Sequence, residues 1–123
     1  MTTKILLVDD SEPVRWDLRT VLSLSGDLEI VGEAANGLEA MRLTESLQPD
    51  VVLIDLEMPV MDGYEATRQI RQQPQFKDLP IIALTANTMK GDKEKVLAAG
   101  MNDYIAKPFN PDVMFITMAK WIK

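Results

Sequence analysis

The segment from Val51 to Gly63 places the strongest constraint on how this chain can fold. Val51 to Ile54 form an unbroken apolar run rich in β-branched residues, the pattern of a strand that helices cover on both faces. The run stops at Asp55, after which Met58-Pro59 and Asp62-Gly63 predict a loop and a turn before the next helix. The segment therefore predicts a buried parallel strand with a carboxylate at its carboxyl end, where open α/β sheets build their sites. Taken alone, Asp55 can equally be an acid that only begins a loop.

Other apolar runs predict further strands, and these alternate with helical patterns. The expected strands are Lys4–Val8, Leu28–Glu33, Val51–Ile54, Pro80–Leu84 and Asp103–Ala106. The expected helices run from Ser11 to about Leu24, from Asn36-Gly37 to before Pro49, from about Tyr64 to Gln72, from about Thr88 to Ala99, and from Asn110 to the end, with a polar loop at Pro74–Leu79. Ser11 and Asn110 are expected to be N-caps of their helices. This alternation predicts one doubly wound α/β domain over residues 1–123, with a five-stranded parallel sheet in three layers and a flavodoxin-like topology.

Composition excludes several classes of function. The net charge of −6 argues against direct binding of nucleic acid, which needs a basic face. The chain has no cysteine and no histidine, so thiolate or imidazole metal sites and histidine catalysis are excluded. No apolar run approaches the roughly 18 residues of a membrane span, and the N-terminus lacks a signal-peptide core. We therefore expect a cytoplasmic protein that does not insert into a membrane.

Polar residues follow four of the predicted strands at the point where each ends. These are Asp9-Asp10, Asp55, Thr85 and Lys107. Because the carboxyl ends of parallel strands share one edge of a sheet, three carboxylates, a hydroxyl and an ammonium should converge there. Acids this close repel unless one is protonated or a cation lies among them, and all-oxygen ligands favour a hard ion such as Mg²⁺. Each residue has an ordinary structural explanation by itself, but the combination suits phosphoryl transfer to a carboxylate.

The chain resembles, over its whole length, the receiver domain of two-component response regulators. The segments that carry this resemblance are Val8-Asp9-Asp10, Asp55-Leu56-Glu57-Met58-Pro59-Val60-Met61-Asp62-Gly63, Leu84-Thr85-Ala86 and Lys107-Pro108-Phe109. The resemblance implies a signalling switch and not an enzyme; the switch would take up a phosphoryl group with Mg²⁺ and slowly hydrolyse the resulting aspartyl phosphate. In such a switch Asp55 would take a phosphoryl group from the phosphohistidine of a separate kinase or phosphotransfer protein. Asp9 and Asp10 would then hold Mg²⁺ together with Asp55 and the backbone carbonyl of Glu57.

The resemblance also implies how phosphorylation would be sensed. Thr85 would hydrogen-bond one phosphoryl oxygen and Lys107 would pair with another, while the small Ala86 leaves room for the group. Tyr104 matches the aromatic residue that turns inward when Thr85 moves, although it can also be an ordinary strand aromatic. The output face would comprise the fourth helix, the fifth strand and the fifth helix.

The predicted last helix is apolar around most of its circumference. Met114, Thr117, Met118 and Trp121 form one stripe, and most other positions are apolar as well. One side must pack on the sheet, so the surplus could bind a partner or form a homodimer. A terminal helix covered by residues outside this sequence would look the same.

Other functions remain open from sequence. A haloacid-dehalogenase-like phosphatase is disfavoured because the residue two after the nucleophile is Glu57, not Asp, and the strand is the third. Asp9-Asp10-Ser11 replaces the phosphate loop that flavin binding needs. A receiver-like binding module that works without phosphorylation usually lacks one of the acids, the threonine or the lysine, and all are present. A stand-alone regulator, a hybrid-kinase receiver and a receiver of a DNA-binding regulator would all look alike.

Overall fold

The computed structural model describes residues 2–85, 90–107 and 109–122, with only the backbone for 90–92. Five strands form one parallel sheet: β1 (Thr3–Val8), β2 (Leu28–Ala34), β3 (Val51–Asp55), β4 (Ile81–Thr85) and β5 (Asp103–Ala106). Their order across the sheet is β2-β1-β3-β4-β5, the flavodoxin-like order. The predicted fold class is confirmed.

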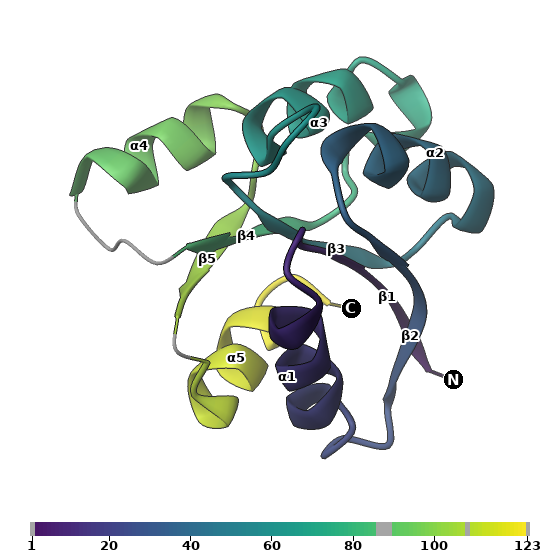
Figure 1. Ribbon diagram of the computed structural model, residues 1–123, viewed down its shortest axis with the longest axis vertical. Coiled ribbons are helices and arrows are strands. Elements are labelled where there is room, and N and C mark those ends of the chain that lie inside the picture. The colour runs from purple at the N-terminus through teal and green to yellow at the C-terminus, as the bar shows by residue number, and fades with distance from the viewer. Residues whose placement is uncertain (1, 86–89, 108, 123) are drawn as a thin grey trace.

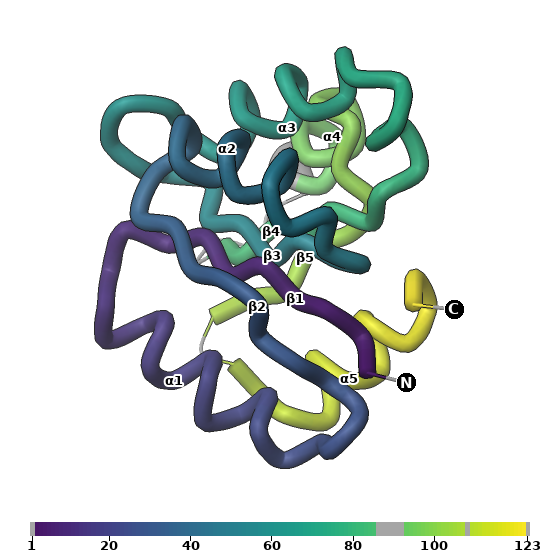
Figure 2. The backbone as a smooth tube through the Cα atoms, turned by 90° about the vertical axis from the view of Figure 1, so that its right-hand side faces the viewer, coloured from purple at the N-terminus to yellow at the C-terminus, as the bar shows by residue number. Residues whose placement is uncertain are grey.

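Helices cover both faces of this sheet, as Figures 1 and 2 show. The helices α1 (Glu12–Leu22) and α5 (Pro111–Ala119) lie on one face. The other face carries α2 (Gly37–Leu47), α3 (Gly63–Arg71) and α4 (Lys90–Ala98). None of the helices in the described ranges is long and apolar enough to cross a membrane.

The hydrophobic core is divided by the sheet into two clusters. Leu6, Val8, Val52 and Ile54 face the layer of α2, α3 and α4, whereas Ile5, Leu7, Val51 and Leu53 face α1 and α5. Side chains of a strand point alternately to its two faces, so a central strand between two helical layers must be apolar at every position. This requirement explains the unbroken apolar runs in β1 and β3.

Side-chain caps begin α1, α2, α3 and α5. The Oγ of Ser11 accepts from the N–H of Val14 (3.4 Å). In the same way, Oδ1 of Asn36 accepts from the N–H of Glu39, and Oδ1 of Asp62 accepts from the N–H of Glu65 (both 2.9 Å). Asn110 caps α5, and Pro111 follows at its first position, where the missing N–H of proline costs nothing. The caps predicted at Ser11 and Asn110 are confirmed.

Three local expectations were wrong, one for a loop and two for the ends of helices. Pro74–Leu79 is not a plain polar loop, because Pro74–Phe76 form a 3₁₀ turn that buries Phe76 to 5% exposure. The last helix stops at Ala119, where the chain turns so that the indole N–H of Trp121 can donate to Asp103 (3.0 Å). The first helix ends at Leu22 and leaves Leu24 exposed. Tertiary burial and hydrogen bonding override the local pattern in the first two cases. Thr88 lies outside the described residues.

Candidate functional site

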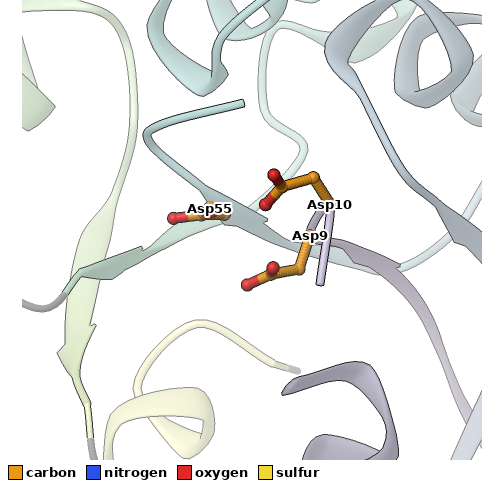
Figure 3. A group of neighbouring side chains, drawn as sticks. All are labelled: Asp9, Asp10 and Asp55. Carbon is orange, nitrogen blue, oxygen red and sulfur yellow. The ribbon is translucent and has the colours of Figure 1, made fainter. Parts of the chain in front are cut away.

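Three carboxylates meet where the strand order of the sheet reverses. Asp9 and Asp10 follow β1, and Asp55 ends the neighbouring strand β3. One carboxylate oxygen from each residue lies within 4.8 Å of the other two (Figure 3). Asp9 and Asp55 are buried, whereas Asp10 is exposed. The convergence predicted from the strand ends is therefore present, at the position where open α/β sheets bind their ligands.

Lys107 reaches into this acidic cluster from the far side of β4. Its Nζ lies 3.2 Å from Oδ2 of Asp9 and 3.7 Å from Oδ1 of Asp55. Its main-chain N–H donates to the carbonyl of Thr85 (2.7 Å), which holds the turn after β5 against the end of β4. The lysine thus bridges the two buried acids and is directed at the oxygen atoms of Asp55.

The electrostatics of the cluster match a divalent cation. Burial, and then the charges of Asp9 and Asp10, raise the pKa of Asp55 to about 6, although Lys107 and a backbone hydrogen bond from Glu57 act to lower it. Among the described side chains of this cluster, the three carboxylates and the one ammonium of Lys107 leave an excess of two negative charges. All of the available ligand atoms are oxygens, which are the donors that Mg²⁺ prefers. The residues present therefore fit this ion.

Two glycines hold the loop that follows Asp55. A Cβ at Gly63 would overlap the carbonyl oxygen of Asp55, and a Cβ at Gly37 would overlap that of Met61. The N–H of Gly63 donates to Leu56 (3.1 Å), and that of Gly37 to Met61 (2.8 Å). The first turns of α3 and α2 therefore pack directly on this main chain. Sequence reasoning took Gly63 for a turn signal and missed the close approach.

The same loop contains an unusual backbone conformation at Val60. Its φ is 70°, in a region that β-branched residues rarely adopt. The N–H of Met61 donates to the carbonyl of Pro59 (2.7 Å), which closes a three-residue turn. Val60 is also exposed. No sequence pattern pointed to this conformation.

The other predicted site residues lie close to this edge of the sheet. Thr85 ends β4 and is buried, one position beyond the Leu84 that pairs with Asp55. Tyr104 lies on β5, where it pairs with Ala83 of β4. Its side chain is half-buried against the hydrophobic core under α3 and α4. Glu57 is exposed. Ala86 lies outside the described residues. The geometry brings Asp9, Asp10, Asp55 and Lys107 into one cluster, with Thr85 at its border.

Comparison with known proteins agrees with this geometry. Residues 5–119 match the response regulator receiver domain family. The response regulator protein VraR of Staphylococcus aureus is 46% identical over 110 residues, which are 87% of this chain and 50% of the relative. The chain thus spans about half the length of the curated relatives it matches.

Solved structures are similar over nearly the whole chain. The receiver domain of the sensor histidine kinase PA1611 from Pseudomonas aeruginosa, solved with a magnesium ion coordinated in its active site cleft, is 40% identical (TM-score 0.88, 98% of each chain). A chain in the co-crystal of the Saccharomyces cerevisiae phosphotransfer protein Ypd1 with the receiver domain of the response regulator Ssk1 is 28% identical (TM-score 0.85, 98% of this chain and 88% of that chain). With the match over residues 5–119, these likenesses establish that the chain belongs to the response regulator receiver domain family, the signalling switches of two-component systems.

Proposed function

We propose that this chain is a phosphorylatable switch in which Asp55 accepts a phosphoryl group from a phosphohistidine of a kinase or phosphotransfer protein. The observation that carries the proposal is the placement of Lys107 Nζ between Asp9 and Asp55, with the Asp10 carboxylate beside them. The 123 residues contain no histidine, so the donor histidine lies outside them.

The transfer is a displacement at phosphorus. A carboxylate oxygen of Asp55 forms the new O–P bond as the N–P bond of the donor breaks, and the imidazole leaves with the electron pair of that bond. With a pKa of about 6, Asp55 is mostly ionised at neutral pH and can act as the nucleophile. Lys107, 3.7 Å from Asp55, is positioned to pair with a phosphoryl oxygen once the group is attached.

Mg²⁺ is the cofactor that we propose for this transfer. The carboxylates of Asp9, Asp10 and Asp55 and the backbone carbonyl of Glu57 would hold it, and the ion would neutralise charge on the phosphoryl oxygens. The excess of negative charge around Asp55 and the all-oxygen donor set support this assignment. The coordinated magnesium described for the PA1611 receiver domain supports it further.

The switch itself would use Thr85 and Tyr104. A phosphoryl group adds close to two negative charges, which attract hydrogen-bond donors such as the hydroxyl of Thr85. Movement of Thr85 would open space on the same face of β4 and β5 for Tyr104. This shift would alter the face formed by α4, β5 and α5, where Val113 and Ile116 are 50% and 63% exposed and would be available to a partner or a second copy of the chain.

The test is the intact mass of the protein after incubation with Mg²⁺ and a small acyl-phosphate donor. Wild type should gain one phosphoryl group, and Asp55→Asn or added EDTA should abolish the gain. Asp27→Asn, which removes an exposed acid far from the site, is the matched control and should react like wild type. A wild-type protein that gains no phosphoryl group would indicate a receiver-like binding module that works without phosphorylation.

A further inference from the structure

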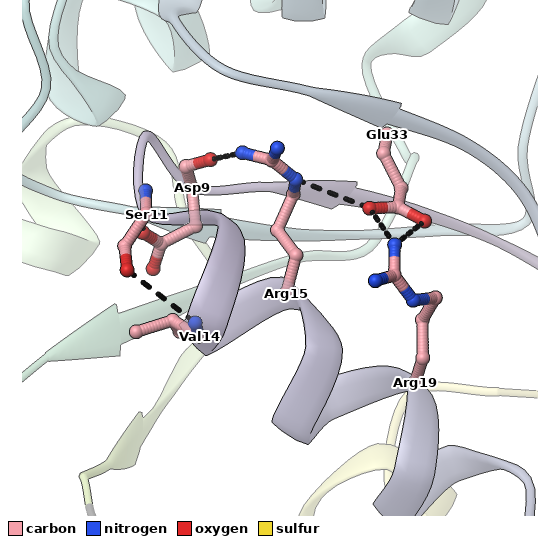
Figure 4. A network of polar contacts seen from close by, with 6 residues as sticks. All are labelled: Asp9, Ser11, Val14, Arg15, Arg19 and Glu33. Carbon is pink, nitrogen blue, oxygen red and sulfur yellow. Dashed lines mark hydrogen bonds and ion pairs between the residues drawn. The ribbon is translucent and has the colours of Figure 1, made fainter.

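A cluster of charged residues beside the site contacts the main chain of Asp9. Figure 4 shows Arg15 of α1 donating from Nη1 to the carbonyl oxygen of Asp9 and from Nε to Glu33 of β2 (3.1 Å). Arg19, one turn further along α1, donates from Nη1 to both carboxylate oxygens of Glu33 (2.6 Å each). Both arginines bind the same carboxylate, but only Arg15 also reaches Asp9.

These contacts hold the Asp9 main chain from two sides. The N–H of Asp9 donates to the carbonyl of Ala34 on β2 (3.0 Å), and its carbonyl accepts from Arg15. The Arg15 side chain is 16% exposed, so solvent competes little for this contact. The position of the guanidinium is in turn set by Glu33, which binds its Nε.

The carbonyl of Asp9 belongs to the same planar peptide group as the N–H of Asp10. Fixing the orientation of that plane restricts ψ of Asp9 and φ of Asp10, and hence the direction in which the Asp10 side chain leaves the backbone. This restriction is important because Asp10 is exposed, and no donor among the described residues holds its carboxylate. The backbone thus fixes the direction of the Cα–Cβ bond from which this carboxylate extends toward Asp55.

We propose that Arg15 is a positioning residue for the cation site. Anchored by Glu33, it fixes the Asp9–Asp10 peptide group and so holds the Asp10 carboxylate in the direction that a divalent cation requires. The inference rests on the proposed function, since it concerns the same site, and it adds a role for Arg15 and Glu33 that does not involve contact with the ion.

Charge and geometry make opposite predictions for one substitution. Arg15→Gln removes a positive charge close to three acids, which by electrostatics alone should tighten the binding of a cation. Loss of positioning should weaken it instead. Arg15→Lys keeps the charge but cannot bind Glu33 and the Asp9 carbonyl with a planar fork. Arg19→Gln removes the same charge and the same ion-pair partner of Glu33 without any contact to Asp9, so it is the matched control.

The experiment measures the Mg²⁺ dissociation constant by isothermal titration calorimetry for wild type and these three variants. We expect Arg15→Gln and Arg15→Lys to bind Mg²⁺ about 10-fold more weakly, as when an outer partner of a metal site is removed. Arg19→Gln should stay within about twofold of wild type because a solvent-screened charge further away has little effect. The Asp10 amide signal of the metal-free protein, followed by nuclear magnetic resonance, should shift in the Arg15 variants and not in Arg19→Gln. This signal also shows that each variant is folded.

The possible failures are separable. If wild type binds Mg²⁺ and takes up a phosphoryl group but Arg15→Gln binds the ion as tightly or more tightly, the positioning role is overturned and the proposed function stands. Equal weakening in Arg19→Gln would also overturn it, because the cause would then be general packing of α1 on β2. A wild-type protein without Mg²⁺ affinity would overturn both.

Discussion

The two edges of the sheet use acidic and amide side chains in opposite ways. At the amino edge these side chains accept hydrogen bonds from the chain itself. Asp50 accepts from the N–H of Lys4 (2.8 Å), and Asn102 accepts from the N–H of Ile81 (2.9 Å) and from Arg71 (2.8 Å). Asp103 accepts from the indole of Trp121 (3.0 Å). These three side chains accept hydrogen bonds from donors of the chain, so they contribute stability at this edge.

At the carboxyl edge the acids are placed together with too few positive charges. Among the residues that the structure describes, Asp9, Asp10 and Asp55 share one ammonium, Lys107, and burial raises the pKa of Asp55 to about 6. Charges that repel in the folded state lower stability. The comparison indicates that the amino edge stabilises the fold, while the carboxyl edge is less stable and forms the site where we propose that a cation and a phosphoryl group bind.

The largest expected effect tests the amino edge. Arg71 donates to the carbonyls of Gly100 (2.8 Å) and Phe76 (2.7 Å) as well as to Asn102. Arg71→Ala removes these three hydrogen bonds, although Asn102 still accepts from the N–H of Ile81. The substitution should lower the free energy of unfolding by about 4 kcal/mol, measured by urea denaturation. Mg²⁺ affinity of the folded fraction should be unchanged. Arg68→Ala, which removes an exposed pair with Glu65, is the control and should cost under about 0.5 kcal/mol. Similar losses in the two variants would contradict the comparison.

The next effect tests the carboxyl edge through pH. The pKa of Asp55 is raised from 3.8 to about 6 on folding, so between these values the folded state binds more protons than the unfolded state. The stability of the metal-free protein should therefore fall by about 3 kcal/mol as the pH rises through this window. Urea denaturation in EDTA from about pH 4 to about pH 7 measures the slope. Asp55→Asn should lose this part of the slope. Identical slopes in the two proteins would show that folding does not raise the pKa of Asp55.

The smallest effect tests the packing that positions Asp55. Gly63→Ala places a methyl group against the carbonyl of Asp55, and overpacking of this kind costs about 2 kcal/mol. Because the displaced atoms belong to Asp55, phosphoryl uptake measured by intact mass should also slow. Gly26→Ala adds the same methyl group where no atom lies within 4 Å and should leave both quantities unchanged. Normal uptake in Gly63→Ala would show that the close contact does not position the acid.

The sequence by itself determined the layered architecture and the composition of the site. Unbroken apolar runs at Ile5–Val8 and Val51–Ile54 require burial on both faces, and that requirement alone predicts parallel strands between helices. Parallel strands bring their carboxyl ends to one edge, so the meeting of Asp9, Asp55 and Lys107 follows from the topology. Local chemistry also predicted the caps at Ser11 and Asn110, since a cap depends only on residues within one turn.

Only the tertiary structure decided which atoms meet. Periodicity records whether a residue is buried, but not what it is buried against. It gave no sign that Gly63 packs on the carbonyl of Asp55, or that Arg15 links Glu33, 18 residues away, to the main chain of Asp9. Phe76 is likewise buried by contacts with distant segments, although the sequence around it is polar. These contacts join segments distant in sequence, so their energies depend on the three-dimensional packing and leave no repeating pattern in the chain.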